Sequence, residues 1–167
     1  MLVYNKTFDL FHTIFRLLQL TEAKRSILEI DKLRILDFYL VFPSEMLEIK
    51  SFRGFKRYET LLENEKNTYE RILDRKRVFF KMENIQLSAM RALVSYGLFD
   101  AEEFKAGKIL RTGKSLPDNL LHKIDEANTK DKELLSLIVD RLAAMDLYGH
   151  LGLKERTNLI EFKYDAI

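Results

Sequence analysis

The sequence predicts an α+β fold that is predominantly α-helical, with a winged-helix-like core, a small β-wing and a C-terminal strand. Three observations predict it. Apolar residues recur at helical spacing through most of the chain, two short strand-like segments interrupt the helices, and the last residues alternate between apolar and polar. The order of the elements in the first two thirds is helix, strand, helix, helix, strand. A winged-helix core, in which helices precede a small β-wing, has this kind of order.

Two helices and a strand are predicted before Pro43. Thr7 is the expected N-cap of a first helix that reaches residue 20 and carries a broad apolar face. A short strand is predicted over residues 26–30. Asp31 is expected to cap a second helix over residues 32–42, which is apolar on almost every side and is therefore predicted to be central. Pro43 should end it.

Residues 43–57 are predicted to form a loop and a short strand, and a brief helix is expected over residues 58–63. A long helix should follow, beginning at about Tyr69 or Arg75 and ending at Gly97, a typical C-cap residue. The remaining predictions, in chain order, are a strand at residues 108–112, helices at 118–126 and 131–147, and a closing strand at 159–164.

The chain has 167 residues, and 47% of them are hydrophobic. This length and composition predict a single domain, residues 1–167, able to bury a sizeable core. A subdivision is also compatible with the sequence, with a winged-helix-like core at residues 1–115 and C-terminal helices plus the closing strand at 116–167.

The sequence has no cysteine, which excludes disulfides and cysteine-ligated zinc and suits a reducing cytoplasm. Its start does not resemble a signal peptide. The longest apolar run, residues 38–42, is far shorter than the ~20 residues that span a bilayer. We therefore expect a cytoplasmic protein without a membrane partner.

The net charge of +2 hides an uneven distribution. Residues 50–81 carry ten basic and five acidic side chains, whereas the segments before and after them are slightly acidic. Local excess charge influences the choice of partner more than the total does. The positive charge is thus concentrated in the middle of the chain.

No catalytic or metal-binding pattern is evident. His12, His122 and His150 lie in three separate segments, and no two of them have the spacing of metal ligands. The glycines form no phosphate-binding loop. We expect no enzymatic activity, no cofactor, no metal and no small-molecule substrate. A weaker alternative is a small hydrolase assembled from scattered carboxylates such as Asp37 and Glu161.

Two basic features are candidate binding sites for nucleic acid or an acidic partner. In the first, aromatic residues alternate with cations; those cations are Lys50, Arg53, Lys56 and Arg57. The alternative is that the aromatic rings enter the core and the cations are merely solvated. The second lies on one face of the long helix, because its polar residues are spaced by three and four. They are Arg77, Lys81, Asn84, Ser88 and Arg91.

The face on the long helix has three interpretations: contact with DNA, contact with an acidic partner helix, or exposure to water. Lys108, Arg111 and Lys114 on the predicted wing would add to the same positive field if they lie on the same side.

The chain ends on a distinctive segment, "LGLKERTNLIEFKYD", residues 151–165. Its strand at 159–164 is expected to pair with the wing and close the fold. At a sheet edge, the same strand could also receive a strand from a partner.

Four segments resemble the middle component of bacterial ABC-three-component systems. They are "YNKTFDLFHTIFRLLQL" (4–20), "DKLRILDFYLVFP" (31–43), "ALVSYGLFD" (92–100) and "GLKERTNLIEFKYD" (152–165). These systems overlap with the Lamassu anti-phage and anti-plasmid systems, in which the corresponding subunit is called LmuC. The shared terminal block contains Lys154, Arg156, Thr157, Asn158 and Glu161, which would bind a partner or hold the terminus in place.

The resemblance implies a non-catalytic adaptor. Such a subunit would assemble with an SMC-like ABC ATPase and with an effector, often a nuclease, and would help to couple DNA sensing to release of the effector. DNA contact would come through the assembled complex. The alternative from the residues alone is a stand-alone winged-helix DNA-binding protein.

Overall fold

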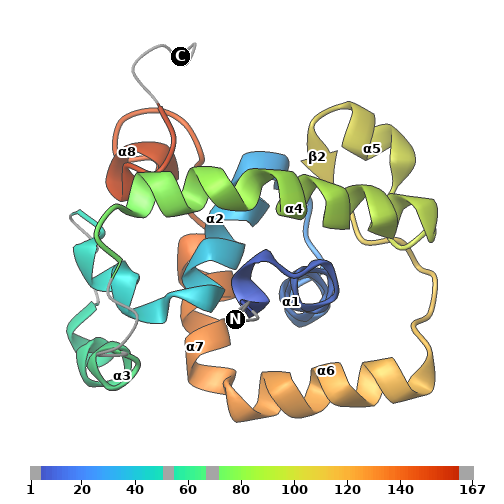
Figure 1. Cartoon of the computed structure of the whole chain (residues 1–167), viewed down its shortest axis with the longest axis horizontal. Coiled ribbons are helices and arrows are strands. Elements are labelled where there is room, and N and C mark those ends of the chain that lie inside the picture. Colours follow the sequence, from blue (N-terminus) through green and yellow to red (C-terminus); the bar gives the residue numbers. More distant parts are fainter. Residues whose placement is uncertain (1–4, 51–54, 67–71, 162–167) are drawn as a thin grey trace.

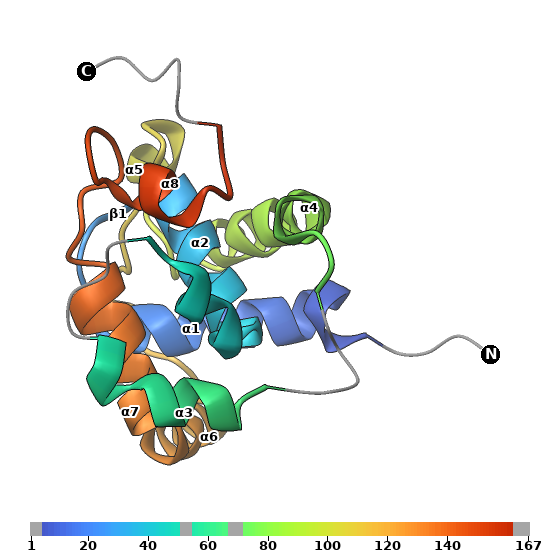
Figure 2. The same ribbon diagram turned by 90° about the vertical axis from the view of Figure 1, so that its left-hand side faces the viewer.

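The computed structural model describes residues 5–50, 55–66 and 72–161 (Figure 1). The protein is mostly helical and contains one small antiparallel sheet, which confirms the predicted predominantly α-helical class. Helix α1 (Leu10–Ala23) lies between α4 (Arg75–Ser95) on one side and α6 (Asp118–Lys130) on the other, and it packs against both (Figures 1 and 2).

The first helix begins two residues later than predicted. Thr7 lies in a 3₁₀ helix, η1 (Lys6–Phe8), and α1 spans Leu10–Ala23. Its N-cap is Asp9, whose carboxylate accepts a hydrogen bond from the backbone N–H of His12 at 2.9 Å. Thr7 is buried, so Asp9 rather than Thr7 satisfies the free backbone N–H group at the helix start.

The second helix is central, as predicted. Strand β1 (Leu28–Glu29) leads directly into α2 (Ile30–Val41). Asp31 lies in the first turn of α2 and is not its N-cap, so this prediction was wrong by two residues. Eight consecutive residues of α2, from Lys32 to Tyr39, are buried.

The segment after α2 contains 3₁₀ helices where a loop and a strand were predicted. Pro43 is the first residue of η2 (Pro43–Glu48), where its missing N–H costs nothing. A second 3₁₀ helix, η3 (Phe55–Arg57), precedes α3 (Glu59–Asn64), which confirms the predicted brief helix. Residues 51–54 lie outside the described part of the chain.

The long helix α4 spans Arg75–Ser95, and the side chain of Asp74 caps its start. Gly97 adopts the left-handed conformation (φ 73°) just past its end, as predicted. The buried side chains of α4 share the face that packs against α1 and α2; they are Phe79, Met82, Gln86, Ala89, Met90 and Leu93.

The predicted strands at 26–30 and 108–112 do pair. In the sheet, β1 is antiparallel to β2 (Lys108–Ile109), with Leu28 opposite Ile109. An isolated bridge joins Phe99 to Arg111. Between these two bridging residues lies a short helix, α5 (Ala101–Lys105), that was not predicted.

Helix α6 spans Asp118–Lys130 and continues one turn beyond its predicted end. The predicted helix at 131–147 is shorter and irregular. It consists of α7 (Lys132–Ser136) and a π-helix, η4 (Leu137–Leu142), after which the chain turns. Its apolar residues at helical spacing, Leu134, Ile138 and Leu142, are nevertheless buried, as expected for such a helix.

The described C-terminal residues do not form the predicted closing strand. Helix α8 spans Leu153–Thr157, and Asn158 ends it in the left-handed conformation (φ 53°). Residues 159–161 form a bend without strand pairing, and residues 162–164 lie outside the described part. Leu159 is nevertheless buried, so it anchors the chain after α8 against the core.

The buried apolar side chains form one connected cluster. It extends from Leu17 in α1 to Leu159 after α8 and includes side chains from α2, α3, α4, α6 and α7. No helix within the described part of the chain is long and apolar enough to cross a membrane.

Candidate binding surfaces and their polar framework

A buried carboxylate, Asp37, organises the contact of the three central helices. Asp37 in α2 is completely buried, and the guanidinium of Arg16 in α1 donates to both of its oxygens, at 2.6 and 3.2 Å. The side-chain amide of Gln86 in α4 donates to the same carboxylate at 2.9 Å. A buried charge is stable only when it is paired and hydrogen-bonded in this way. Asp37 therefore joins α1, α2 and α4 at a fixed point.

Arg34 extends the same framework along α2. Its guanidinium lies 4.7 Å from the centre of the Phe79 ring and donates to the Gln86 side-chain oxygen at 3.2 Å. It also forms ion pairs with Asp31 (2.9 Å) and Glu83 (2.8 Å). One nearly buried cation thus connects two carboxylates, an amide and an aromatic ring.

The terminal block joins this framework through Lys154. The Lys154 side chain is buried, its ammonium lies 3.7 Å from Asp31, and it stands 4.7 Å from the centre of the Tyr148 ring. Asp31 therefore forms ion pairs with Arg34 and with Lys154, two residues that lie more than a hundred positions apart in the sequence. This placement favours the structural alternative for Lys154 over a direct partner contact.

Arg156 joins α8 to the start of the basic segment. The Arg156 guanidinium donates to the backbone oxygens of Leu151 and Lys50, the latter at 3.2 Å, and the Lys50 N–H donates to the Arg156 backbone oxygen at 3.2 Å. Each of the two segments thus donates a hydrogen bond to the backbone of the other. Sequence reasoning predicted both residues but not their contact.

The other residues of the terminal block have different environments. Thr157 is buried, Asn158 ends α8, and Glu161 is exposed. Asp37 and Glu161, the carboxylates of the hydrolase alternative, therefore differ completely in exposure. Asp37 is hydrogen-bonded inside the core and Glu161 lies at the surface.

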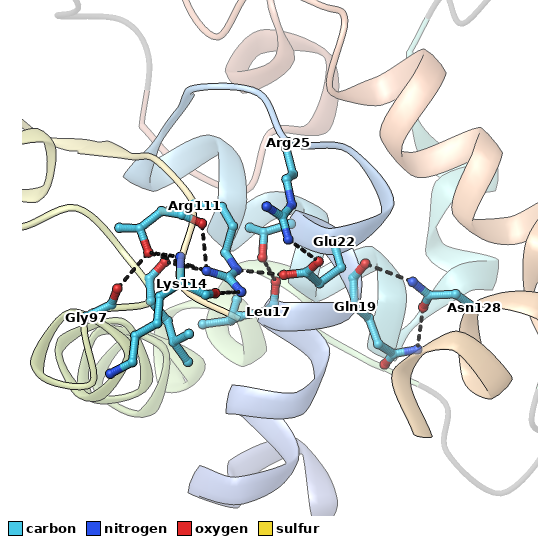
Figure 3. Close-up of polar contacts among 11 residues, drawn as sticks. Leu17, Gln19, Glu22, Arg25, Gly97, Arg111, Lys114 and Asn128 are labelled. Carbon is cyan, nitrogen blue, oxygen red and sulfur yellow. Dashed lines mark hydrogen bonds and ion pairs between the residues drawn. The ribbon is translucent and has the colours of Figure 1, made fainter. Parts of the chain in front are cut away.

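A second polar cluster fixes the sheet to α1 (Figure 3). Arg111 is buried and its guanidinium donates to Glu22 at 2.6 Å, to the Thr112 backbone oxygen at 2.8 Å and to the Lys114 backbone oxygen at 2.7 Å. The Lys114 ammonium donates to the backbone oxygen of Tyr96, at the C-terminal end of α4, at 2.6 Å. Cations are favourable at that end of a helix.

The cluster in Figure 3 corrects the prediction that Arg111 adds to a positive surface. The charge of Arg111 is neutralised by its ion pair with Glu22, and Glu22 also forms an ion pair with Arg25 at 2.7 Å. Burial by itself raises the pKa of the Glu22 carboxyl, but the hydrogen bonds and charges of Arg25 and Arg111 outweigh it. The pKa of Glu22 therefore lies below its ordinary value. Beside it, Gln19 and Asn128 exchange two hydrogen bonds and fix α6 to α1.

The cations of the predicted basic segment are solvent-exposed where they are described. Lys50, Lys56 and Arg57 are exposed, and the Arg57 guanidinium lies 5.7 Å from the centre of the Tyr58 ring. Arg53 and Phe52 lie outside the described residues. The structure thus brings Lys50 to α8 and leaves Lys56 and Arg57 in η3, before the start of α3.

The polar face of α4 is exposed along its whole length, as the spacing predicted. Its members are Arg77, Lys81, Asn84, Ser88 and Arg91. Lys76 is also exposed. Within the described parts of the chain, none of the four cations on α4 that face solvent forms an ion pair, in contrast to Arg34 and Arg111 inside the fold. This face is therefore a fully exposed candidate binding surface.

The three histidines are separate in space as in sequence. Each lies near a different acidic side chain: Asp9 at 2.9 Å from His12, Glu126 at 3.6 Å from His122, and Glu155 at 3.6 Å from His150. In residues 5–50, 55–66 and 72–161, no three potential ligands come together in an arrangement that could hold a metal ion.

Comparison with known proteins gives one match. The family model described as "ABC-three component (ABC-3C) system Middle Component 5" matches residues 2–165, which is nearly the whole chain. No curated protein and no solved structure matches it significantly.

Proposed function

Since this chain belongs to the family of middle components of ABC-three-component systems, we propose that it is a non-catalytic adaptor subunit. In this role it bridges an SMC-like ABC ATPase and an effector, often a nuclease, and helps to couple DNA sensing to release of the effector. ATP hydrolysis belongs to the ATPase, and the destructive chemistry belongs to the effector.

The match over residues 2–165 is the observation that carries the proposal. The polar framework supports it, since the internal charged residues are used to hold helices together. Asp37 is neutralised by Arg16, and Glu22 by Arg111. A rigid body with exposed cations on α4 suits a subunit that works by contact.

More specific assignments are part of the same proposal. We assign the system to the Lamassu type of anti-phage and anti-plasmid defence, with this chain as the LmuC-like subunit, acting in the cytoplasm. The quoted terminal block, residues 152–165, supports this assignment. Sequencing the neighbouring genes tests it, because a Lamassu system requires an ATPase gene with a long heptad region beside this one.

Co-expression tests the adaptor role. The tagged chain, expressed with the products of its two neighbouring genes, should retain both on an affinity column and elute with them as one species from a sizing column. A chain that elutes as a monomer beside both neighbours contradicts the proposal. So does nucleotide or nucleic-acid turnover by the isolated chain that one substitution in it abolishes.

The second candidate function is a stand-alone winged-helix DNA-binding protein. The predicted order of helix, strand, helix, helix and strand is found in α1, β1, α2, α4 and β2, although the short helices α3 and α5 lie between them. This order and the exposed cations of α4 favour the candidate. Phosphate contacts release counterions, so binding of the isolated chain to duplex DNA should weaken steeply with salt. No binding at low salt, or an affinity that salt does not change, removes this candidate.

A further inference from the structure

The outer face of α4 carries an apolar row beside its cations. Phe80 is 73% exposed, an unusual state for a large aromatic side chain in the middle of a regular helix. Leu87 and Val94 follow at intervals of seven residues and are half-buried at the edge of the core. Single exposed apolar side chains are ordinary on protein surfaces, but Phe80 continues into a row of apolar side chains at one spacing and has cations on both sides of it.

The geometry of the helix explains how exposure changes along the row. Seven residues make slightly less than two turns, so a seven-residue row drifts by about 20° per repeat around the helix. The drift carries the row from solvent toward the core, which agrees with an exposed Phe80 and with half-buried Leu87 and Val94. The apolar row is therefore most exposed to solvent in the N-terminal half of α4, at Phe80.

A second row runs beside the first with the same spacing. It consists of Arg77, Asn84 and Arg91, all exposed. An apolar row flanked by a charged row, both repeating every seven residues, is the pattern by which one helix receives another along its length. With 21 residues, α4 offers about 30 Å for such a contact.

We propose that the outer face of α4 is the docking surface for a helix of another component of the same system, with an apolar row that covers Phe80 and Leu87 and with acidic side chains that pair with Arg77 and Arg91. The inference rests on the proposed adaptor function and deepens it by naming the surface and the chemistry of the partner. Lys76 and Lys81 extend the positive field around Phe80 and favour an acidic partner further.

The apolar row distinguishes a protein partner from DNA. Phosphates would account for Arg77, Lys81 and Arg91, but they leave the exposed ring of Phe80 without a favourable contact. An amphipathic helix satisfies both rows at once. Asn84 and Ser88, which lie between the cations, are small enough to let a second helix approach closely.

Substitutions in the co-expressed complex test the proposal. Phe80→Ser removes the aromatic contact, and the double variant Arg77→Glu with Arg91→Glu reverses the charged row. Phe11→Ser is the matched control for the first, because Phe11 is 79% exposed on α1 and belongs to neither row. Lys123→Glu with Lys130→Glu, both exposed on α6, is the control with the same change of charge. Circular dichroism of each isolated variant checks that it folds.

We expect both α4 variants to weaken binding of one component at least about tenfold, as loss of a central aromatic or arginine contact usually does. Both controls should bind as the wild type does. A photo-crosslinker, p-benzoylphenylalanine, at position 80 should attach to a helical segment of that component, and changing a nearby acidic residue there to Lys should restore binding of the Glu variant.

Each other outcome contradicts the inference. If the complex forms equally well with both α4 variants, or if the crosslink falls on DNA, the docking surface is wrong and the adaptor function stands. If the wild-type chain binds neither component, the adaptor function and the inference fall together.

Discussion

At the scale of single residues, the fold depends on charges that are buried and paired. Asp37 has no exposed surface, and it is held by Arg16 and Gln86 from two neighbouring helices. Asp31 similarly receives Arg34 from its own helix and Lys154 from near the other end of the chain. Such buried ion pairs add little to the free energy of unfolding, because the cost of removing both charges from water offsets their attraction. Removing one partner, however, leaves a buried charge without a counter-ion. These positions should therefore be the most sensitive to substitution.

Replacing Asp37 with Asn should destabilise the fold by about 3–5 kcal/mol, because Arg16 would keep its charge in a nearly buried site without a counter-ion. Urea denaturation measures the change in the free energy of unfolding. Asp125→Asn, at an exposed position of α6, is the control and should lie within about 0.5 kcal/mol of wild type. An Asp37→Asn protein as stable as this control would show that the network does not hold the helices.

Glu22 should make stability depend on pH in the acidic range. Its pKa is lowered in the folded state, so its ion pairs with Arg25 and Arg111 stabilise the protein above the ordinary pKa of about 4.5. This stabilisation is lost as the pH falls through the lowered value. Between pH 5 and pH 3 the wild type should lose more stability than Glu22→Gln, as urea denaturation at each pH can show. Equal losses would contradict this role for Glu22.

At the scale of elements, the helices were predicted well where a periodic pattern and an end signal agree. Helix α4 has both, with apolar spacing along its length and Gly97 just past its end. The start of α1 was misplaced because Thr7 and Asp9 are both good caps and only tertiary packing decides between them. After α7, the spacing of apolar residues predicted which face is buried. It did not distinguish a π-helix from a regular α-helix, because the same face is buried in both.

In the terminal segment, the kind of element was predicted wrongly. The alternating pattern after Asn158 predicted a strand, but its described part, residues 159–161, contains a bend and no strand pairing. Alternation reports which residues are buried and does not require a neighbouring strand to pair with. Leu159 is buried without one.

Gly152 should be essential for the packing of α8. A methyl group there would lie 2.4 Å from the backbone oxygen of Tyr148 and 2.7 Å from its carbonyl carbon, so the backbone itself must move. Gly152→Ala should lower the melting temperature clearly. Gly113→Ala is the matched control, since its added methyl meets nothing within 4 Å. Equal melting temperatures of the two variants would mean that the turn before α8 adapts freely.

At the scale of the whole molecule, the candidate surfaces were easier to predict than the interior framework. The spacing of Arg77, Lys81 and Arg91 was sufficient to place them on one exposed face. The contacts of Arg34, Asp37 and Gln86 were missed, because residues 52 positions apart meet only after folding. The sequence did contain a signal for these contacts, because charged residues such as Arg34 and Asp37 within a buried helix require partners.

Contacts between distant residues also decide which of the predicted cations are buried and which are exposed. Arg111 and Arg91 look alike in the sequence, yet Arg111 is buried against Glu22 and Arg91 faces solvent. The surface available to a partner is thus narrower than the basic composition of the chain suggests. For an adaptor this matters, because burial removes Arg111 from the surface, whereas the other predicted cations in the described parts of the chain stay exposed on α4, in η3, at Lys50, and at Lys108 and Lys114.

The most direct test of the adaptor function is whether the effector and the ATPase remain together without this chain. A tag on the ATPase is used to purify the complex from cells that express all three components or only the other two. We predict that the effector is retained in the first case and lost in the second. Retention of the effector at full yield in the absence of this chain would contradict the bridging role.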